Sequence, residues 1–74
     1  MSKKMQELSV PAHSPVAGKQ LVEISLPKDV LVVYIQRDDD YLIPHGNSVI
    51  AAGDLLFVLA DEKALDTLRL LLNE

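Results

Sequence analysis

The chain contains two short runs in which almost every residue is apolar. The first, VLVVYIQR, covers residues 30–37, and the second, LLFVLA, covers residues 55–60. Their length and their content of β-branched and aromatic residues predict two strands. Strict alternation gives the first strand two apolar faces, with Val30, Val32 and Tyr34 on one and Leu31, Val33 and Ile35 on the other. The second strand is also apolar on both sides.

The last segment, residues 61–74, has a helical period. In DEKALDTLRLLLNE the apolar residues recur at spacings of three, four and seven, which predicts an amphipathic helix. Asp61 is the expected N-cap, and Glu62 places a favourable negative charge in the first turn. The apolar stripe consists of Ala64, Leu65, Leu68, Leu71 and Leu72. Leu70 lies on the opposite, polar side, where it is either simply exposed or touches a partner chain.

The N-terminal half predicts two shorter elements. Residues 7–10 have the pattern of a short strand, which Pro11 ends or confines to a sheet edge. Residues 14–27 place Leu21, Val22 and Ile24 at helical spacing after a Ser-Pro start, and the proline at the end of this segment stops the helix. We therefore expect a helix of about two turns between these limits.

Turn residues connect the remaining strands. The triplet 38–40 is three aspartates and predicts a tight turn into a strand at 41–44, while Gly53 and Asp54 predict the turn before the strand at 55–60. The element order is β-α-β-β-β-α, which predicts an α+β fold. We expect a mainly antiparallel sheet that carries the helices on one face and dimerises through the other.

Size and composition support the dimer. A domain of 74 residues has a net stability of only about 3–5 kcal/mol, and this chain has no cysteine for disulfides and only two histidines for metals. Helices can cover one apolar face of the sheet. The second face exceeds the roughly 300–600 Å² of the largest apolar patch on a typical monomer, so a symmetric dimer is the expected solution.

Charge and hydropathy exclude some partners. Seven basic and eleven acidic residues give a net charge of −4, which disfavours nucleic acid and anionic membrane surfaces. Aromatic residues make up 4% of the chain, too few for a base-stacking platform. The longest uncharged stretch, 41–53, is interrupted by proline and glycine, and the first residues lack the apolar core of a signal peptide. We expect a cytoplasmic domain without membrane insertion.

No catalytic or metal-binding motif emerges from the sequence. His13 and Ser14 are adjacent, a spacing that seldom gives a nucleophile and its base the required geometry. The aspartates at 38–40 lack the glycine and glutamate of a calcium loop, so a solvated turn is favoured over a cation site. We therefore predict no enzymatic activity, no metal and no cofactor.

Two features point instead to ligand recognition. The segment HGNS, residues 45–48, has turn composition, although His45 and Asn47 can also direct donors into a cleft. Arg37 ends an apolar strand, where a planar cation suits a phosphate or a carboxylate. The simpler interpretation of Arg37 is an ion pair with the neighbouring aspartates.

The chain resembles the TrkA C-terminal, or RCK-C, domain family over almost its whole length. The resemblance is carried by Gly18, Lys19, Leu21, Ile24, Leu26, Pro27, Val33, Ile35, Arg37, Pro44, Ile50, Gly53, Asp54, Leu56 and Val58. It implies a domain over 7–74, preceded at 1–6 by a flexible linker or by residues added for expression. The run 41–61 is most similar to the version attached to bacterial monovalent cation/proton antiporters.

The resemblance also implies a function. The family comprises dimeric regulatory modules of bacterial potassium channels, transporters and cation/proton antiporters. Several members bind cyclic di-AMP between protomers, so cyclic di-AMP or another adenine nucleotide is the implied regulatory ligand. Leu31 and Val32 would flank the bases, with Arg37, His45 and Asn47 as polar contacts. The implied partners are a second copy and the membrane-embedded antiporter or transporter portion of the same parent chain, at the inner membrane. The alternative is a purely structural domain for dimerisation or protein interaction, without a ligand.

Overall fold

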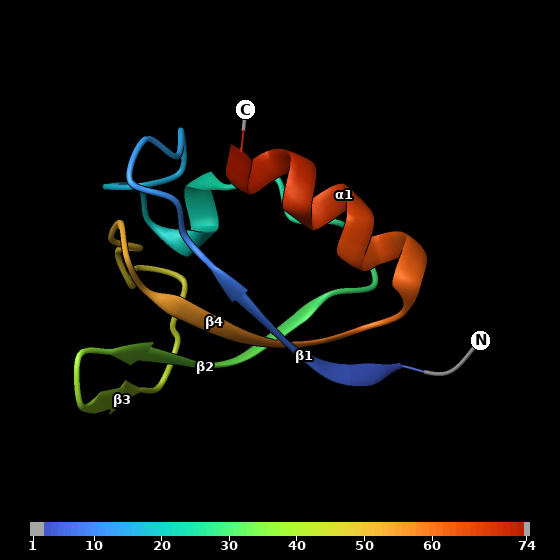
Figure 1. Cartoon of the computed structure of the whole chain (residues 1–74), viewed down its shortest axis with the longest axis horizontal. Helices are drawn as coiled ribbons and strands as arrows, with labels where there is room; N and C mark the ends of the chain where they lie inside the picture. Colours follow the sequence, from blue (N-terminus) through green and yellow to red (C-terminus); the bar gives the residue numbers. More distant parts are fainter. Residues whose placement is uncertain (1–2, 74) are drawn as a thin grey trace.

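A single antiparallel sheet with a helix against one face makes up the described part of the chain, residues 3–73 of the computed structural model (Figure 1). The strands are β1 (Lys4–Ser9), β2 (Leu31–Arg37), β3 (Asp40–Leu42) and β4 (Leu55–Ala60), in the sheet order β1-β4-β2-β3. The helical elements are the single 3₁₀ turn η1 (Leu21–Glu23) and α1 (Glu62–Asn73). The predicted α+β class is confirmed.

Strand β4 lies between β1 and β2 and organises the core. Leu56, Val58 and Ala60 are buried on the face that α1 covers, whereas the intervening residues are half-buried on the opposite face. The core around them consists of Leu8, Val10, Val16, Ile35, Ile50, Leu65, Leu68 and Leu72. Period-two alternation therefore divides this strand between a closed face and an uncovered face.

The alternation predicted for β2 is wrong beyond Val32. Val32 pairs with Val58, but the next paired residue, Tyr34, faces Phe57, because a bulge lies between Val32 and Tyr34. One extra residue in a strand reverses the face of every residue after it. Tyr34 consequently shares the uncovered face with Phe57, and Ile35 turns into the core, where its side chain is 1% exposed.

The helix of about two turns predicted within 14–27 is also wrong, since the segment contains only the 3₁₀ turn η1. Three of its backbone N–H groups bond to a distant segment: those of Gly18, Leu21 and Val22 donate to carbonyls at positions 50, 48 and 46. These long-range bonds replace the i→i−4 bonds of a helix. The apolar side chains of 21, 24 and 26 still pack against the core.

The N-terminal strand begins earlier than predicted. Residues 4–6 lie in β1 and pair with residues 60, 59 and 58 of β4. The prediction that residues 1–6 form a flexible linker is therefore wrong at positions 4–6. The KMQ sequence has no strand pattern of its own, and the neighbouring strand supplies the pairing. Residues 1 and 2 of that expected linker lie outside the described residues, as does the last residue of the domain proposed over 7–74.

The C-terminal helix follows the prediction closely. The Asp61 carboxylate accepts a 2.9 Å hydrogen bond from the N–H of Ala64, so Asp61 is the N-cap, as predicted. Leu65, Leu68 and Leu72 are buried, while Leu70 is exposed. Within residues 3–73, no helix combines the length and the apolar character that crossing a bilayer requires.

Replacing Asp61 with alanine is expected to lower the free energy of unfolding by about 1 kcal/mol, because the N–H of Ala64 loses its acceptor. The melting temperature should fall by about 4–8 °C. Thermal unfolding followed by circular dichroism measures this change. Asp66→Ala, an exposed position on the same helix, serves as control and should shift the melting temperature less; equal shifts would contradict the capping role.

Candidate functional site

Arg37 and Asp54 form a bidentate ion pair at the end of β2. Arg37 Nε donates to Asp54 Oδ1 at 2.9 Å and Arg37 Nη2 donates to Asp54 Oδ2 at 2.7 Å. The Asp54 side chain is 1% exposed and that of Arg37 is 40% exposed. Arg37 Nη2 also donates to the carbonyl of Val49 at 2.9 Å. The arginine thus ties β2 to two points of the β3–β4 connection.

Asp54 also closes the turn that starts β4. Its Oδ2 accepts the N–H of Ala51 at 2.9 Å, and its own N–H donates to the Ala51 carbonyl at 3.1 Å. Gly53 has φ +88° at the third position of this turn, a conformation that suits glycine. The carbonyl of Asp54 accepts from Val10 and the N–H of Gly53 donates to Val10, which fixes β1 to the turn. The turn predicted at Gly53 and Asp54 is confirmed.

The ion pair shifts the pKa of each partner in the direction that keeps the group charged. Burial alone raises the pKa of the Asp54 carboxyl, but the hydrogen bonds from Arg37 and Ala51 outweigh it and hold that pKa below its ordinary value. The hydrogen bond to Asp54 raises the pKa of the Arg37 guanidinium. Both groups are therefore charged near neutral pH.

This geometry changes the role expected for Arg37. The predicted ion pair between Arg37 and the neighbouring aspartates is wrong, because the partner of Arg37 is Asp54, 17 residues away. Arg37 uses Nε and Nη2 for the fold, and among residues 3–73 its Nη1 group donates no hydrogen bond. Arg37 is therefore first a structural residue, and only its Nη1 group remains for a ligand.

His45 and Asn47 lie on an exposed turn. The N–H of His45 donates to Ser48 Oγ at 2.8 Å, and the N–H of Ser48 donates to the His45 carbonyl at 3.0 Å. The Gly46 carbonyl accepts the N–H of Val22 and anchors the turn beside η1. The predicted turn is confirmed. The His45 ring and the Asn47 side-chain amide are exposed and make no hydrogen bond within the described residues.

Exposed apolar side chains come from the segments that meet at this turn. Val22 is 71% exposed, Ile43 77% and Val49 48%. A Cβ placed on Gly46 would lie 3.7 Å from the Cβ of Val22, so the turn and η1 are in contact. Together with His45 and Asn47, these three residues define the loop surface. None of these three was predicted as a site residue, although Ile43 and Val49 flank the PHGNS segment.

Leu31 and Val32 lie elsewhere. Leu31 begins β2 and Arg37 ends it, a separation of roughly 20 Å at about 3.3 Å per residue. The two residues also face opposite sides, because Val32 packs against the core and Leu31 is 60% exposed. The structure therefore brings Arg37 to the loop surface through Val49 but does not bring Leu31 or Val32 there.

The uncovered side of the sheet forms a second surface, which we call the open face. It consists of Met5, Leu31, Tyr34, Tyr41, Leu55, Phe57 and Leu59. Tyr34 stacks on Phe57 with ring centroids 4.2 Å apart and meets Tyr41 edge-on at 5.4 Å. Figure 1 shows α1 on the other side of the sheet, so residues 3–73 contain no element that covers the open face.

The adjacent His13 and Ser14 have a structural explanation. Ser14 is buried, and its hydroxyl accepts the N–H of Val16 at 3.2 Å, while His13 is exposed. The hydroxyl thus stabilises a tight turn by a local side-chain bond. This arrangement offers no activated nucleophile.

The fold defines the class of protein. The RCK_C domain dimer of S. agalactiae BusR in complex with c-di-AMP superposes with a TM-score of 0.84 at 25% identity, covering 93% of this chain and 95% of that one. The same protein is known in complex with its busAB-promoter DNA, where the matching part is 35% of that chain. The chain therefore has the RCK_C fold.

Sequence comparison gives the family. The profile of the TrkA-C domain matches residues 5–73, and the chain belongs to the TrkA-C domain family. It is 34% identical over 67 residues to the Trk system potassium uptake protein TrkA of Mycobacterium tuberculosis, covering 89% of this chain and 30% of that protein. It is also 34% identical over 59 residues to TrkA homolog 2 of Methanosarcina mazei, covering 80% and 13%. The chain thus spans less than a third of these relatives.

Proposed function

We propose that this chain is the cytosolic regulatory domain of a potassium or sodium/proton antiporter or a related potassium transport protein. It acts as a dimer that senses cyclic di-AMP or another adenine nucleotide, without catalysis and without binding nucleic acid. The family assignment and the similarity to an RCK_C dimer in complex with c-di-AMP support this proposal. The membrane-embedded partner is another portion of the parent chain, at the inner membrane.

The open face carries the dimer proposal. Seven large apolar or aromatic side chains lie on one side of the sheet with no covering element in residues 3–73. Water contact with such a face is unfavourable at about 25 cal/mol per Å². A second copy offers the same face, so a two-fold axis through it covers both at once. Leu31 contributes to this interface, whereas Val32 belongs to the core and is left out of the proposed site.

The loop surface carries the ligand proposal. The His45 and Asn47 side chains present donors and acceptors with no partner inside the described residues, and Arg37 adds the donors of its Nη1 group. The exposed apolar side chains of Val22, Ile43 and Val49 offer flat contacts to an adenine. A two-fold symmetric ligand such as cyclic di-AMP would use one set of these residues from each protomer.

Regulation then follows from linkage. A nucleotide shared by two protomers favours the dimer geometry in which both loop surfaces reach it. The attached transporter responds only as far as the ligand discriminates between dimer geometries.

Calorimetric titration of the 74-residue chain with cyclic di-AMP tests the proposal. We expect one ligand for two chains, and at least about tenfold weaker binding when His45 and Asn47 are both changed to alanine, because two exposed polar contacts are lost. His13→Ala, another exposed histidine, is the matched control and should bind like the parent chain.

The structural alternative has a specific basis, since Arg37 already uses most of its donors on Asp54 and Val49. If cyclic di-AMP, AMP, ATP and NADH all fail to bind while sedimentation shows a dimer, the domain serves dimerisation only. A true ligand at 100 times its Kd would instead raise stability by about 2.7 kcal/mol. A compact monomer at high concentration would contradict both versions.

A further inference from the structure

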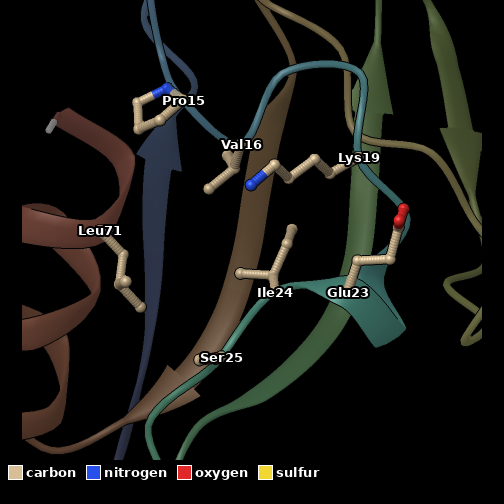
Figure 2. A pocket seen from close by; sticks show the side chains of 7 residues that line it. All are labelled: Pro15, Val16, Lys19, Glu23, Ile24, Ser25 and Leu71. Carbon is tan, nitrogen blue, oxygen red and sulfur yellow. The ribbon is translucent and has the colours of Figure 1, made fainter.

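A pocket of about 290 Å³ lies between α1 and the segment around η1 (Figure 2). Leu71 contributes its wall on the helix, and the remaining residues come from the N-terminal half, namely Pro15, Val16, Lys19, Glu23, Ile24 and Ser25. Its size is just below the range typical of sites for drug-sized ligands. The pocket therefore suits a small molecule and is too small for a dinucleotide.

The walls combine an apolar lining with one cation. Val16, Ile24 and Leu71 present aliphatic surface, and Figure 2 shows the Lys19 side chain extended across the pocket with its ammonium group directed inward. The ion pairs within residues 3–73 join Arg37 to Asp54 and Arg69 to Asp66, so Lys19 takes part in neither. An ammonium group beside an apolar wall favours an anion over a neutral or cationic guest.

The two other polar residues do not oppose this charge. The Glu23 carboxylate accepts the N–H of Gln20 at 2.8 Å, and Figure 2 shows it pointing away from the pocket centre. Ser25 also lines the pocket. The backbone N–H groups of its neighbours Ile24 and Leu26 both donate to backbone carbonyls, whereas the N–H of Ser25 donates to none within the described part of the chain. In Figure 2, Ser25 lies at the other end of the pocket from the Lys19 ammonium group, so it adds no charge beside it.

We infer that this pocket is a binding site for a small molecule with a short apolar body and a single carboxylate. Val16, Ile24 and Leu71 hold the apolar body, and Lys19 binds the carboxylate. The pocket lies on the α1 side of the sheet, away from the open face, so this inference is independent of the nucleotide proposal.

Titration of the ¹⁵N-labelled 74-residue chain with hexanoate tests the inference by NMR. We expect saturable shifts at Val16, Ile24, Ser25 and Leu71 with a Kd of about 1 mM. Per non-hydrogen atom of hexanoate, the corresponding binding free energy lies between the values typical of the smallest ligands and of drug-sized ligands. Hexanol should bind about fivefold more weakly and hexylamine more weakly still, because both lack the charge that Lys19 recognises.

Lys19→Met should weaken hexanoate binding about fivefold and bring it close to that of hexanol. Lys28→Met, an exposed lysine outside this pocket, is the matched control and should leave the Kd unchanged. Equal affinity for hexanoate and hexylamine in the parent chain would overturn the inference, as would shifts confined to other residues. These readouts do not depend on whether cyclic di-AMP binds.

Discussion

Replacing Asp54 with asparagine is expected to lower the free energy of unfolding by about 3 kcal/mol near pH 7. The change removes the charge that pairs with Arg37 from a side chain that is 1% exposed. Because Arg37 is partly exposed, its guanidinium regains some hydration when the pair is broken. The expected loss of stability therefore lies at the lower end of the range for broken buried ion pairs. Since a domain of this size has about 3–5 kcal/mol in total, the variant should retain only about 0–2 kcal/mol, so that a detectable fraction is unfolded at room temperature.

The pH dependence distinguishes the ion pair from a packing effect. The pKa of Asp54 is lower in the folded than in the unfolded chain, so its carboxylate stabilises the fold fully above the unfolded pKa of about 3.9. That contribution is lost as the pH falls through the folded pKa. The stability gap between the parent chain and Asp54→Asn should therefore stay constant from about pH 7 to 5 and narrow below about pH 4.

Urea unfolding at several pH values measures both effects. Asp39→Asn is the matched control, because it removes the same charge from an exposed position and should change the stability by less than about 0.5 kcal/mol. A gap between Asp54→Asn and the parent that is under 1 kcal/mol, or that does not vary with pH, would contradict the role assigned to the pair.

Leu68→Ala is expected to destabilise the domain by about 3 kcal/mol, whereas Leu70→Ala should change its stability by less than about 0.5 kcal/mol. The two substitutions remove the same atoms from the same helix. Leu68 is 0% exposed and leaves a cavity against the sheet, while Leu70 is 61% exposed and leaves none. The pair therefore isolates the contribution of burial from that of helix propensity.

Thermal or urea unfolding compares the two variants directly. Because about 1 kcal/mol corresponds to about 4–8 °C for a domain of this size, Leu68→Ala should lower the melting temperature by more than about 12 °C. Equal effects at the two positions would show that α1 does not pack as the structure describes. A large effect at Leu70 that depends on protein concentration would instead place Leu70 in an interface.

The ion pair also affects how the nucleotide proposal can be tested. Arg37→Ala would leave the Asp54 carboxylate buried without its partner, so lost ligand binding in that variant would report unfolding. His45 and Asn47 are better positions, because their side chains are exposed and make no hydrogen bond within residues 3–73.

Local chemistry made several features predictable. The strands β2 and β4 follow from dense β-branched and apolar runs, and α1 follows from its period and from the cap at Asp61. The turn at Gly53 and Asp54 follows from residue types that tolerate its geometry. In each case the signal lies within a few consecutive residues, which explains why one sequence sufficed.

The candidate site was less predictable because its parts are distant along the chain. His45 and Asn47 were recognised as turn residues with donors to offer, but Val22 joins them only because η1 pairs with the segment 46–50. Arg37 was recognised as a cation at a strand end, yet its partner is 17 residues away. Neither relation leaves a periodic trace in the sequence.

The sequence by itself determined the fold class, the amphipathic C-terminal helix and the surplus of apolar strand surface, because period and propensity act locally. The tertiary structure alone decided three things: the bulge after Val32, the replacement of a helix by long-range bonds around η1, and the partner of Arg37. Each depends on which backbone and charged groups meet when the chain closes on itself, and pairing between distant segments can outweigh local preference.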